Sequence, residues 1–167
     1  MNEIKITRIH TREAKALDAI DKRILRIMQQ DAGLSVSDIA AQVGLSQTPC
    51  WNRLKRLAAS GVIKRRVAIL DQQKLGLGTT VFVSIQIGDH SRNELARFAR
   101  EVAAMDEVID FYRVAGDVDY CLRVVVPDTA AYDDFYKRLI GLIPIKTVVS
   151  RMALENIKCG TALPIKD

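Results

Sequence analysis

The sequence has few of the residues on which metal, disulfide and membrane proteins depend. It holds three cysteines, two histidines and no apolar run near the roughly 20 residues that a membrane-spanning helix needs. Cys50, Cys121 and Cys159 are far apart, without the close pairing of zinc or redox motifs. Residues 1–16 also lack the apolar block of a secretion signal. We therefore expect a cytoplasmic protein with no metal, no cofactor and no membrane partner.

Acidic residues are missing from one long stretch, between Asp38 and Asp71. Residues 1–70 carry 13 Lys or Arg against 6 Asp or Glu, and residues 71–167 carry 12 against 14, so the formal charges are +7 and −2. A stretch with charges of one sign can simply be a solvent-exposed face of the protein. In a folded segment that contains turns, however, such a basic stretch suits the binding of phosphate groups. The cations within it are Arg53, Lys55, Arg56, Lys64, Arg65 and Arg66.

The N-terminal half has the periodicity of three short helices. The first carries an apolar stripe and ends near Gly33, the second begins at a Ser35–Asp38 capping box and stops at Gly44, and the third ends before Gly61. Two helices joined by a short glycine-containing turn, after a helix that completes the core, predict a helix-turn-helix. The expected buried positions are Leu17, Ile20, Ile24, Ile27, Val36, Ile39, Ala40, Val43, Cys50, Leu54 and Leu57.

The C-terminal half alternates strands and helices. Strands are predicted over 81–87, 108–114 and 120–126, with a last one carrying Val148 to Leu154 in alternation. Helices are predicted after Ser91 and after Asp128. The order βαββαβ is that of a ferredoxin-like domain. The fold class is α+β, with a (winged) helix-turn-helix domain joined by a strand linker to a ferredoxin-like domain.

These patterns predict four segments along the chain. Residues 1–16 are an N-terminal extension, whose cations could touch DNA if it is not simply a disordered tail. Residues 17–61 are the helix-turn-helix domain, 62–78 a strand and linker, and 79–167 an effector-binding and oligomerisation domain.

The third helix offers a DNA-reading face opposite its apolar stripe. Its N-terminal residues would meet base edges in the major groove, and its cations would hold phosphates or a guanine. A small helical bundle with a solvated basic face, or a protein-binding winged helix, is the alternative. The candidate DNA-binding residues are Ser46, Gln47, Thr48, Trp51, Asn52, Arg53, Lys55 and Arg56.

Several strings together resemble the Lrp/AsnC family of leucine-responsive and asparagine-type transcription regulators. In the N-terminal half they are Leu17 to Leu25, Val43 to Ser46, Pro49-Cys50 with Arg53 and Arg56-Leu57, and Gly61 to Ile63. In the C-terminal half they are Gly116 to Tyr120, Tyr132 with Phe135, Glu155 to Lys158, and Leu163-Pro164. Thr48 to Trp51 and Tyr132 to Leu139 further resemble a branch that includes cysteine-responsive detoxification regulators.

The resemblance implies a regulator that binds double-stranded DNA and a small amino-acid effector, with L-cysteine the first to test. It implies a homodimer in which the 62–70 strands pair, assembled into an octamer with effectors between dimers. From the residues alone, two carboxylates on a glycine turn could accept an ammonium group, although such turns are ordinary hairpin ends. The effector-binding residues it implies are Gly116, Asp117, Asp119, Thr129, Arg151, Met152 and Ala153.

Two other functions compete with this one. An architectural protein that organises DNA would bind it broadly, with steep salt dependence and little effector control. An enzyme is the distant alternative, because haem-precursor decarboxylases resemble this family in fold. No nucleophile–base pair is apparent in the sequence, so we expect no catalytic residues.

Overall fold

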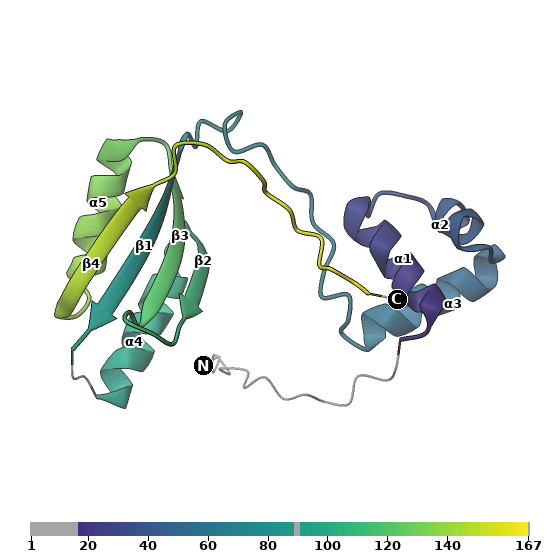
Figure 1. The fold of residues 1–167 in the computed structure, drawn as a ribbon, viewed down its shortest axis with the longest axis horizontal. Coiled ribbons are helices and arrows are strands. Elements are labelled where there is room, and N and C mark those ends of the chain that lie inside the picture. The colour runs from purple at the N-terminus through teal and green to yellow at the C-terminus, as the bar shows by residue number, and fades with distance from the viewer. Residues whose placement is uncertain (1–16, 89–90, 167) are drawn as a thin grey trace. The chain divides into compact units, whose positions relative to one another are not determined.

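A computed structural model describes residues 17–88 and 91–166 and divides them into two compact units (Figure 1). One unit combines residues 17–69 with 158–166, and the other spans residues 70–157. The predictions made for residues 1–16 lie outside the described residues.

Three helices form the N-terminal unit, as predicted: α1 (Ala19–Gln30), α2 (Val36–Val43) and α3 (Gln47–Ala59). Ser35 and Asp38 cap the start of α2 reciprocally, and Asp18 and Asp21 do the same for α1. Gly44 ends α2 in the left-handed region at φ 72°, which glycine adopts without steric cost. This compact turn sets the start of α3 only three residues beyond α2.

The core of this unit comes from all three helices. Cys50, Leu54 and Leu57 are at most 3% exposed, in agreement with the predicted stripe of α3. In α1 the buried side chains also include Leu25, Met28 and Asp21, which the predicted stripe omits. Two of these are apolar side chains beside the stripe, whereas Asp21 is buried because arginines compensate its charge.

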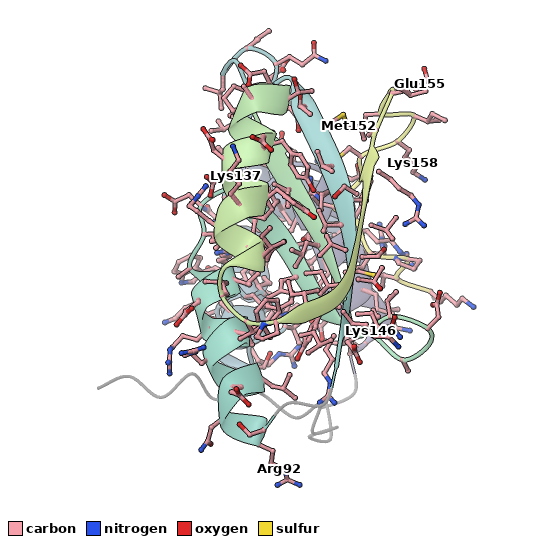
Figure 2. All side chains as sticks on the ribbon, turned by 90° about the vertical axis from the view of Figure 1, so that its left-hand side faces the viewer. Arg92, Lys137, Lys146, Met152, Glu155 and Lys158 are labelled. Carbon is pink, nitrogen blue, oxygen red and sulfur yellow. The ribbon has the colours of Figure 1, made fainter. Side chains whose placement is uncertain are left out.

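The second unit is a four-stranded antiparallel sheet with two helices on one face. Its elements are β1 (Thr79–Ile87), α4 (Arg92–Ala103), β2 (Val108–Arg113), β3 (Tyr120–Val126), α5 (Thr129–Ile140) and β4 (Ile145–Met152). The strand order β2-β3-β1-β4 is that of a ferredoxin-like βαββαβ domain, which confirms the predicted fold class. Figure 2 shows α4, with Arg92 at its start, and α5, with Lys137 along it, on the same side of the sheet.

Apolar side chains on alternate positions of β1 and β3 fill the space between sheet and helices. Val81, Val83 and Ile85 are at most 1% exposed and pack against Phe98 of α4 and Phe135 of α5. The opposite face of the sheet has no layer over it within the described part of this unit, and there Phe82 and Tyr112 are 49% and 60% exposed.

The structure differs from the predicted segments at three places. Residues 62–70, described in full, form no strand, because an isolated strand has no partner for its backbone groups. Leu154 is fully exposed beyond the end of β4. Residues 158–166 pack with the N-terminal unit instead of the ferredoxin-like one, since Ile165 joins the core of the three helices.

Candidate DNA interface and effector site

Helix α3 presents polar and basic side chains on the side away from its buried stripe. Trp51, the one tryptophan, is 49% exposed although its ring is large and apolar. Arg53 lies at the border of this surface and is half-buried. The exposed candidates are Ser46, Gln47, Thr48, Trp51, Asn52, Lys55 and Arg56.

The N-terminus of α3 differs from that of the other described helices. Side chains of Asp18, Ser35, Ser91 and Asp128 accept backbone hydrogen bonds at the starts of α1, α2, α4 and α5. Within the described residues, Ser46 makes no such bond at the start of α3. Its hydroxyl and the first-turn amides are therefore free to approach an anion, as helix N-termini do at phosphates.

Two of the candidate arginines contact two acids at the start of α1, the N-cap residue Asp18 and Asp21. Arg53 Nη1 donates to Asp21 Oδ1 at 2.8 Å and to Asp18 Oδ2 at 2.5 Å, and Arg56 Nη2 donates to Asp21 Oδ2 at 2.5 Å. Asp21 is 2% exposed. Sequence reasoning missed this cluster, because both acids precede the acid-free stretch. The repeated i, i+3 spacing of the two acids and the two arginines is the pattern that indicates it.

The cluster shifts the pKa of Asp18 and of Arg53. The hydrogen bond from Arg53 lowers the pKa of Asp18 below its ordinary value, with help from the Asp21 amide. The same carboxylates raise the pKa of Arg53. Burial raises the pKa of the Cys50 thiol, on the opposite side of α3. Arg53 therefore stays charged and paired over the whole physiological pH range.

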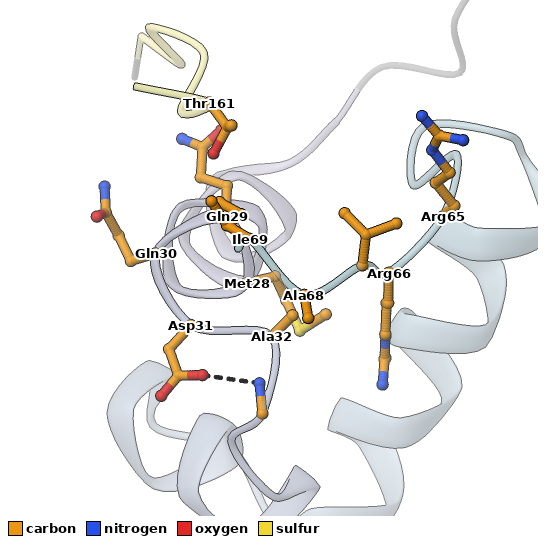
Figure 3. Close-up of a pocket in the computed structure, with 12 residues that line it drawn as sticks. Met28, Gln29, Gln30, Asp31, Ala32, Arg65, Arg66, Ala68, Ile69 and Thr161 are labelled. Atoms are coloured by element: carbon orange, nitrogen blue, oxygen red, sulfur yellow. Dashed lines mark hydrogen bonds between the residues drawn. The ribbon is translucent and has the colours of Figure 1, made fainter. Parts of the chain in front are cut away.

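A pocket of about 720 Å³ lies elsewhere in the same unit, between the end of α1 and the extended residues 65–69 (Figure 3). Arg65 and Arg66 line one side, and Asp31 lines the other, where it accepts a hydrogen bond from the Gly33 amide at 2.7 Å. The described residues around this pocket include none of the candidate DNA-binding or effector-binding residues.

The candidate effector residues fall at opposite ends of the sheet in the ferredoxin-like unit. Gly116, Asp117 and Asp119 precede β3, whereas Thr129 follows it. Ala153 donates to the Thr80 carbonyl at the same end as Thr129, next to Arg151 and Met152. A strand advances about 3.3 Å per residue, so the seven residues of β3 separate the two groups by roughly 20 Å. Within one chain these residues do not form a single site.

Asp119 already has a role within its own chain. Its carboxylate accepts a hydrogen bond from the Ile87 amide at 2.7 Å, and its amide donates to the Ile85 carbonyl at 2.9 Å. These bonds join the β2–β3 turn to the end of β1. Asp117 is exposed on the same turn, so it is the freer of the two carboxylates for an ammonium group.

The residues around Arg151 face the uncovered side of the sheet. Arg151 lies opposite Phe82 in the β1–β4 register and donates to the Ser84 hydroxyl at 3.3 Å. Arg123 and Asp110 form an ion pair at 2.5 Å on the same side.

Within the described residues no helix is long and apolar enough to cross a membrane, and no three His, Cys, Asp or Glu side chains gather as a metal site would require.

Both units match known families. Residues 17–64 match winged helix-turn-helix DNA-binding domains, and residues 80–163 match the Lrp/AsnC ligand binding domain. A winged helix-turn-helix DNA-binding unit and a ligand-binding unit in one chain define a DNA-binding transcription regulator. The chain belongs to the Lrp/AsnC family.

Relatives agree with this assignment over nearly the whole chain. The DNA-binding transcriptional activator DecR of Escherichia coli (strain K12) is 47% identical over 90% of this chain and 99% of its own. The glutamate uptake regulatory protein of Zymomonas mobilis is 41% identical over 92% and 93%. These relatives are regulators rather than enzymes, as expected for this chain.

Solved structures share the architecture. An AsnC family transcriptional regulator from Agrobacterium tumefaciens is 54% identical, covers 88% of this chain and 96% of its own, and has a TM-score of 0.86. A transcriptional regulator from Neisseria meningitidis, solved as a complex with L-Met, is 29% identical, covers 89% and 97%, and has a TM-score of 0.85.

Proposed function

We propose that this protein is a sequence-specific transcription regulator that acts in the cytoplasm and reads DNA with α3. The observation that carries the proposal is the composition of the exposed side of α3, where amide, hydroxyl and indole groups lie together and the helix start is uncapped. Gln47, Thr48, Trp51 and Asn52 would read base edges, while Ser46 and Lys55 would contact phosphates. In a dimer two such helices would enter major grooves about 34 Å apart.

The regulator would respond to an amino acid bound between subunits. The two ends of the sheet carry the two halves of the candidate site, so a complete pocket would combine Gly116, Asp117 and Asp119 of one subunit with Thr129 and the Arg151–Ala153 segment of another. Asp117 suits the ligand's ammonium group, and Arg151 suits its carboxylate. L-cysteine is the first effector to test, on the resemblance to the cysteine-responsive branch.

Homodimers, associating further into octamers, would supply these shared sites. Support comes from two unpartnered surfaces: residues 62–70, where Val67 and Ile69 are 62% and 74% exposed, and the uncovered sheet face around Phe82. Pairing two 62–70 segments and covering Phe82 would remove exposed apolar area. Phe82→Glu should lower the mass measured by light scattering toward the monomer. Ile140→Glu, an exposed site on α5, should leave at least a dimer.

The DNA proposal is tested by fluorescence anisotropy on the promoter that flanks the protein's own gene and on a scrambled duplex, over a salt series. Asn52→Ala should cost about 1–3 kcal/mol on the promoter and nothing on the scrambled duplex. Asn93→Ala, an exposed asparagine of α4, is the control. Equal affinity for both duplexes would indicate an architectural protein instead. If Asn52→Ala bound the promoter as tightly as the wild type, the proposal that α3 lies in the major groove would be refuted.

The effector proposal is tested by repeating the titration with L-cysteine, L-methionine, L-leucine and L-glutamate, with mass measured in parallel. We expect one of them to shift promoter affinity or assembly, and Asp117→Asn to weaken that shift while Asp106→Asn preserves it. Asp119→Asn is a poorer probe, since it also removes the acceptor of the Ile87 amide. If no amino acid changes affinity or mass, the sensing function is refuted.

A further inference from the structure

Asp21 of α1 connects the first helix to the reading helix through charge. Both of its oxygens are occupied, one by Arg53 at 2.8 Å and the other by Arg56 at 2.5 Å, and its side chain is 2% exposed. A carboxylate at this depth is tolerated only when cations and hydrogen bonds compensate it. Asp18 adds a second acceptor for Arg53.

The arginines occupy a flank of α3 that is separate from its outermost surface. Their i, i+3 spacing stacks them one turn apart on the side toward the start of α1. The apolar residues Cys50, Leu54 and Leu57 pack one side of α3 into the core, a contact that involves no directional bonds. Hydrogen-bonded ion pairs are directional, so the bonds from Arg53 and Arg56 to Asp21 add a constraint on the rotation of α3 about its axis.

We propose that Asp21 is a positioning residue for DNA reading. By pairing with Arg53 and Arg56 it fixes the orientation of α3, and it keeps both arginines from acting as phosphate ligands. The inference rests on the proposed role of α3 and revises the sequence-based assignment of both arginines. It divides the cations of α3 into two classes: Lys55 would contact the DNA backbone, whereas Arg53 and Arg56 are paired with Asp21 of α1, although Arg56 is itself 45% exposed.

The salt dependence of DNA binding separates these classes. Each phosphate neutralised contributes about 0.9 to the slope of log affinity against log salt concentration. Lys55→Ala should therefore reduce the slope by about that amount for each reading helix, whereas Arg56→Ala should leave the slope nearly unchanged and lose promoter preference. If Lys55→Ala also left the slope and the affinity unchanged, the proposed role of α3 would fail. If Arg56→Ala reduced the slope as much as Lys55→Ala does, this inference alone would fail.

Asp21→Asn provides the reverse test, because it keeps the shape and removes the charge. We expect the scrambled duplex to bind more tightly with a steeper slope, as the arginines become available, and the ratio of promoter to scrambled affinity to fall at least tenfold. The melting temperature of the N-terminal unit should fall by roughly 5 °C or more. A lower melting temperature with an unchanged slope and ratio would show that Asp21 only stabilises the fold.

Asp18→Asn covers the case in which Asp21→Asn fails to fold. Asp18 is 49% exposed and its carboxylate is hydrogen-bonded to Arg53, so its loss should be tolerated. The same changes in slope and ratio, at smaller size, are expected. Asp31→Asn, at the far end of α1, is the matched control and should alter neither quantity. An Asp18→Asn protein that matched this control would contradict the inference.

Discussion

Cys50 lies in α3, the proposed reading helix, yet its side chain points into the core and is fully buried. Its neighbour Trp51 is half exposed, and the next residue, Asn52, is exposed. At the residue scale, one turn of α3 thus contains a core contact and two candidate base readers. This arrangement follows from the helical period, which rotates successive side chains by about 100°.

The thiols report on this arrangement directly. Burial raises the pKa of Cys50, so less thiolate forms, and its sulfur is also inaccessible, whereas Cys159 is exposed. With a disulfide reagent at pH 8, we expect Cys159 to react in the first phase and Cys50 only at the rate at which the N-terminal unit opens. Cys159→Ser should remove the fast phase. Rapid labelling of Cys50 in the folded protein would contradict the burial of this face of α3.

Asp18 gives the N-terminal unit a defined acid sensitivity. Its folded pKa is lowered from an ordinary value of 3.8, mainly by the Arg53 hydrogen bond, so the unfolded state binds more protons near pH 3.8. The contribution is present above that pH and is lost as the pH falls through the folded pKa. Urea midpoints of the wild type should therefore exceed those of Asp18→Asn at pH 6, and the gap should close toward pH 3. A gap that stayed constant with pH would rule out this ion pair as its source.

At the element scale, the turn between α2 and α3 fixes where α3, the proposed reading helix, begins. The Gly44 amide donates to the Ala41 carbonyl and the Leu45 amide to the Ala40 carbonyl, which closes α2 before Ser46 begins the next helix. A bulkier residue at position 44 would meet no atom within 4 Å of its Cβ. The constraint on this residue is therefore the positive φ alone.

Gly44→Ala should lower the free energy of unfolding of the N-terminal unit by about 1 kcal/mol, the cost of an alanine in the left-handed region. Gly44→Asn should cost less, because asparagine tolerates that region better. Chemical denaturation followed by helical circular dichroism measures both. Equal stability of the glycine and alanine proteins would mean that the turn relaxes to a negative φ.

Most elements could be predicted from the sequence, because their signals are local. Ser35 with Asp38, Ser91 with Glu94, and the alternation in β1 each lie within one element. The Asp21–Arg53–Arg56 cluster spans more than 30 residues, so only the fold brings it together. Residues 62–70 are rich in the β-branched residues that favour a strand, but strand formation needs a partner that one chain does not supply.

At the scale of the whole molecule, the chain leaves the helix-turn-helix unit, builds the ferredoxin-like unit and then returns. Among the described residues, two covalent connections therefore join the units, one at residues 69–70 and the other at 157–158. The second begins a few residues after Arg151, Met152 and Ala153. The candidate effector segment is in this way continuous with a segment that packs on α1.

The returning segment, residues 158–166, should stabilise the N-terminal unit. Gln29 exchanges two hydrogen bonds with Leu163, both at 2.9 Å, Arg26 donates to the Ile165 carbonyl at 3.2 Å, and the Ile165 side chain packs on the helical core. Removing residues 158–167 deletes all of these, so the melting temperature of this unit should fall while the ferredoxin-like unit remains folded. Gln29→Ala should cause part of this destabilisation and lower the free energy of unfolding of the unit by about 1 kcal/mol.

Hydrogen exchange reports local stability, so the α1 amides measure the N-terminal unit and the β1 and β3 amides measure the ferredoxin-like unit. Gln30→Ala is the matched control, because Gln30 is the exposed neighbour of Gln29 on the same helix. We expect faster exchange in α1 for the truncated chain and for Gln29→Ala, and unchanged exchange in β1 and β3. Because both variants leave α3 and its cations intact, any loss of promoter affinity that accompanies the faster exchange would reflect how firmly α1 supports the reading helix. Identical exchange in α1 for Gln29→Ala, the truncated chain and the wild type would exclude the returning segment as part of that support.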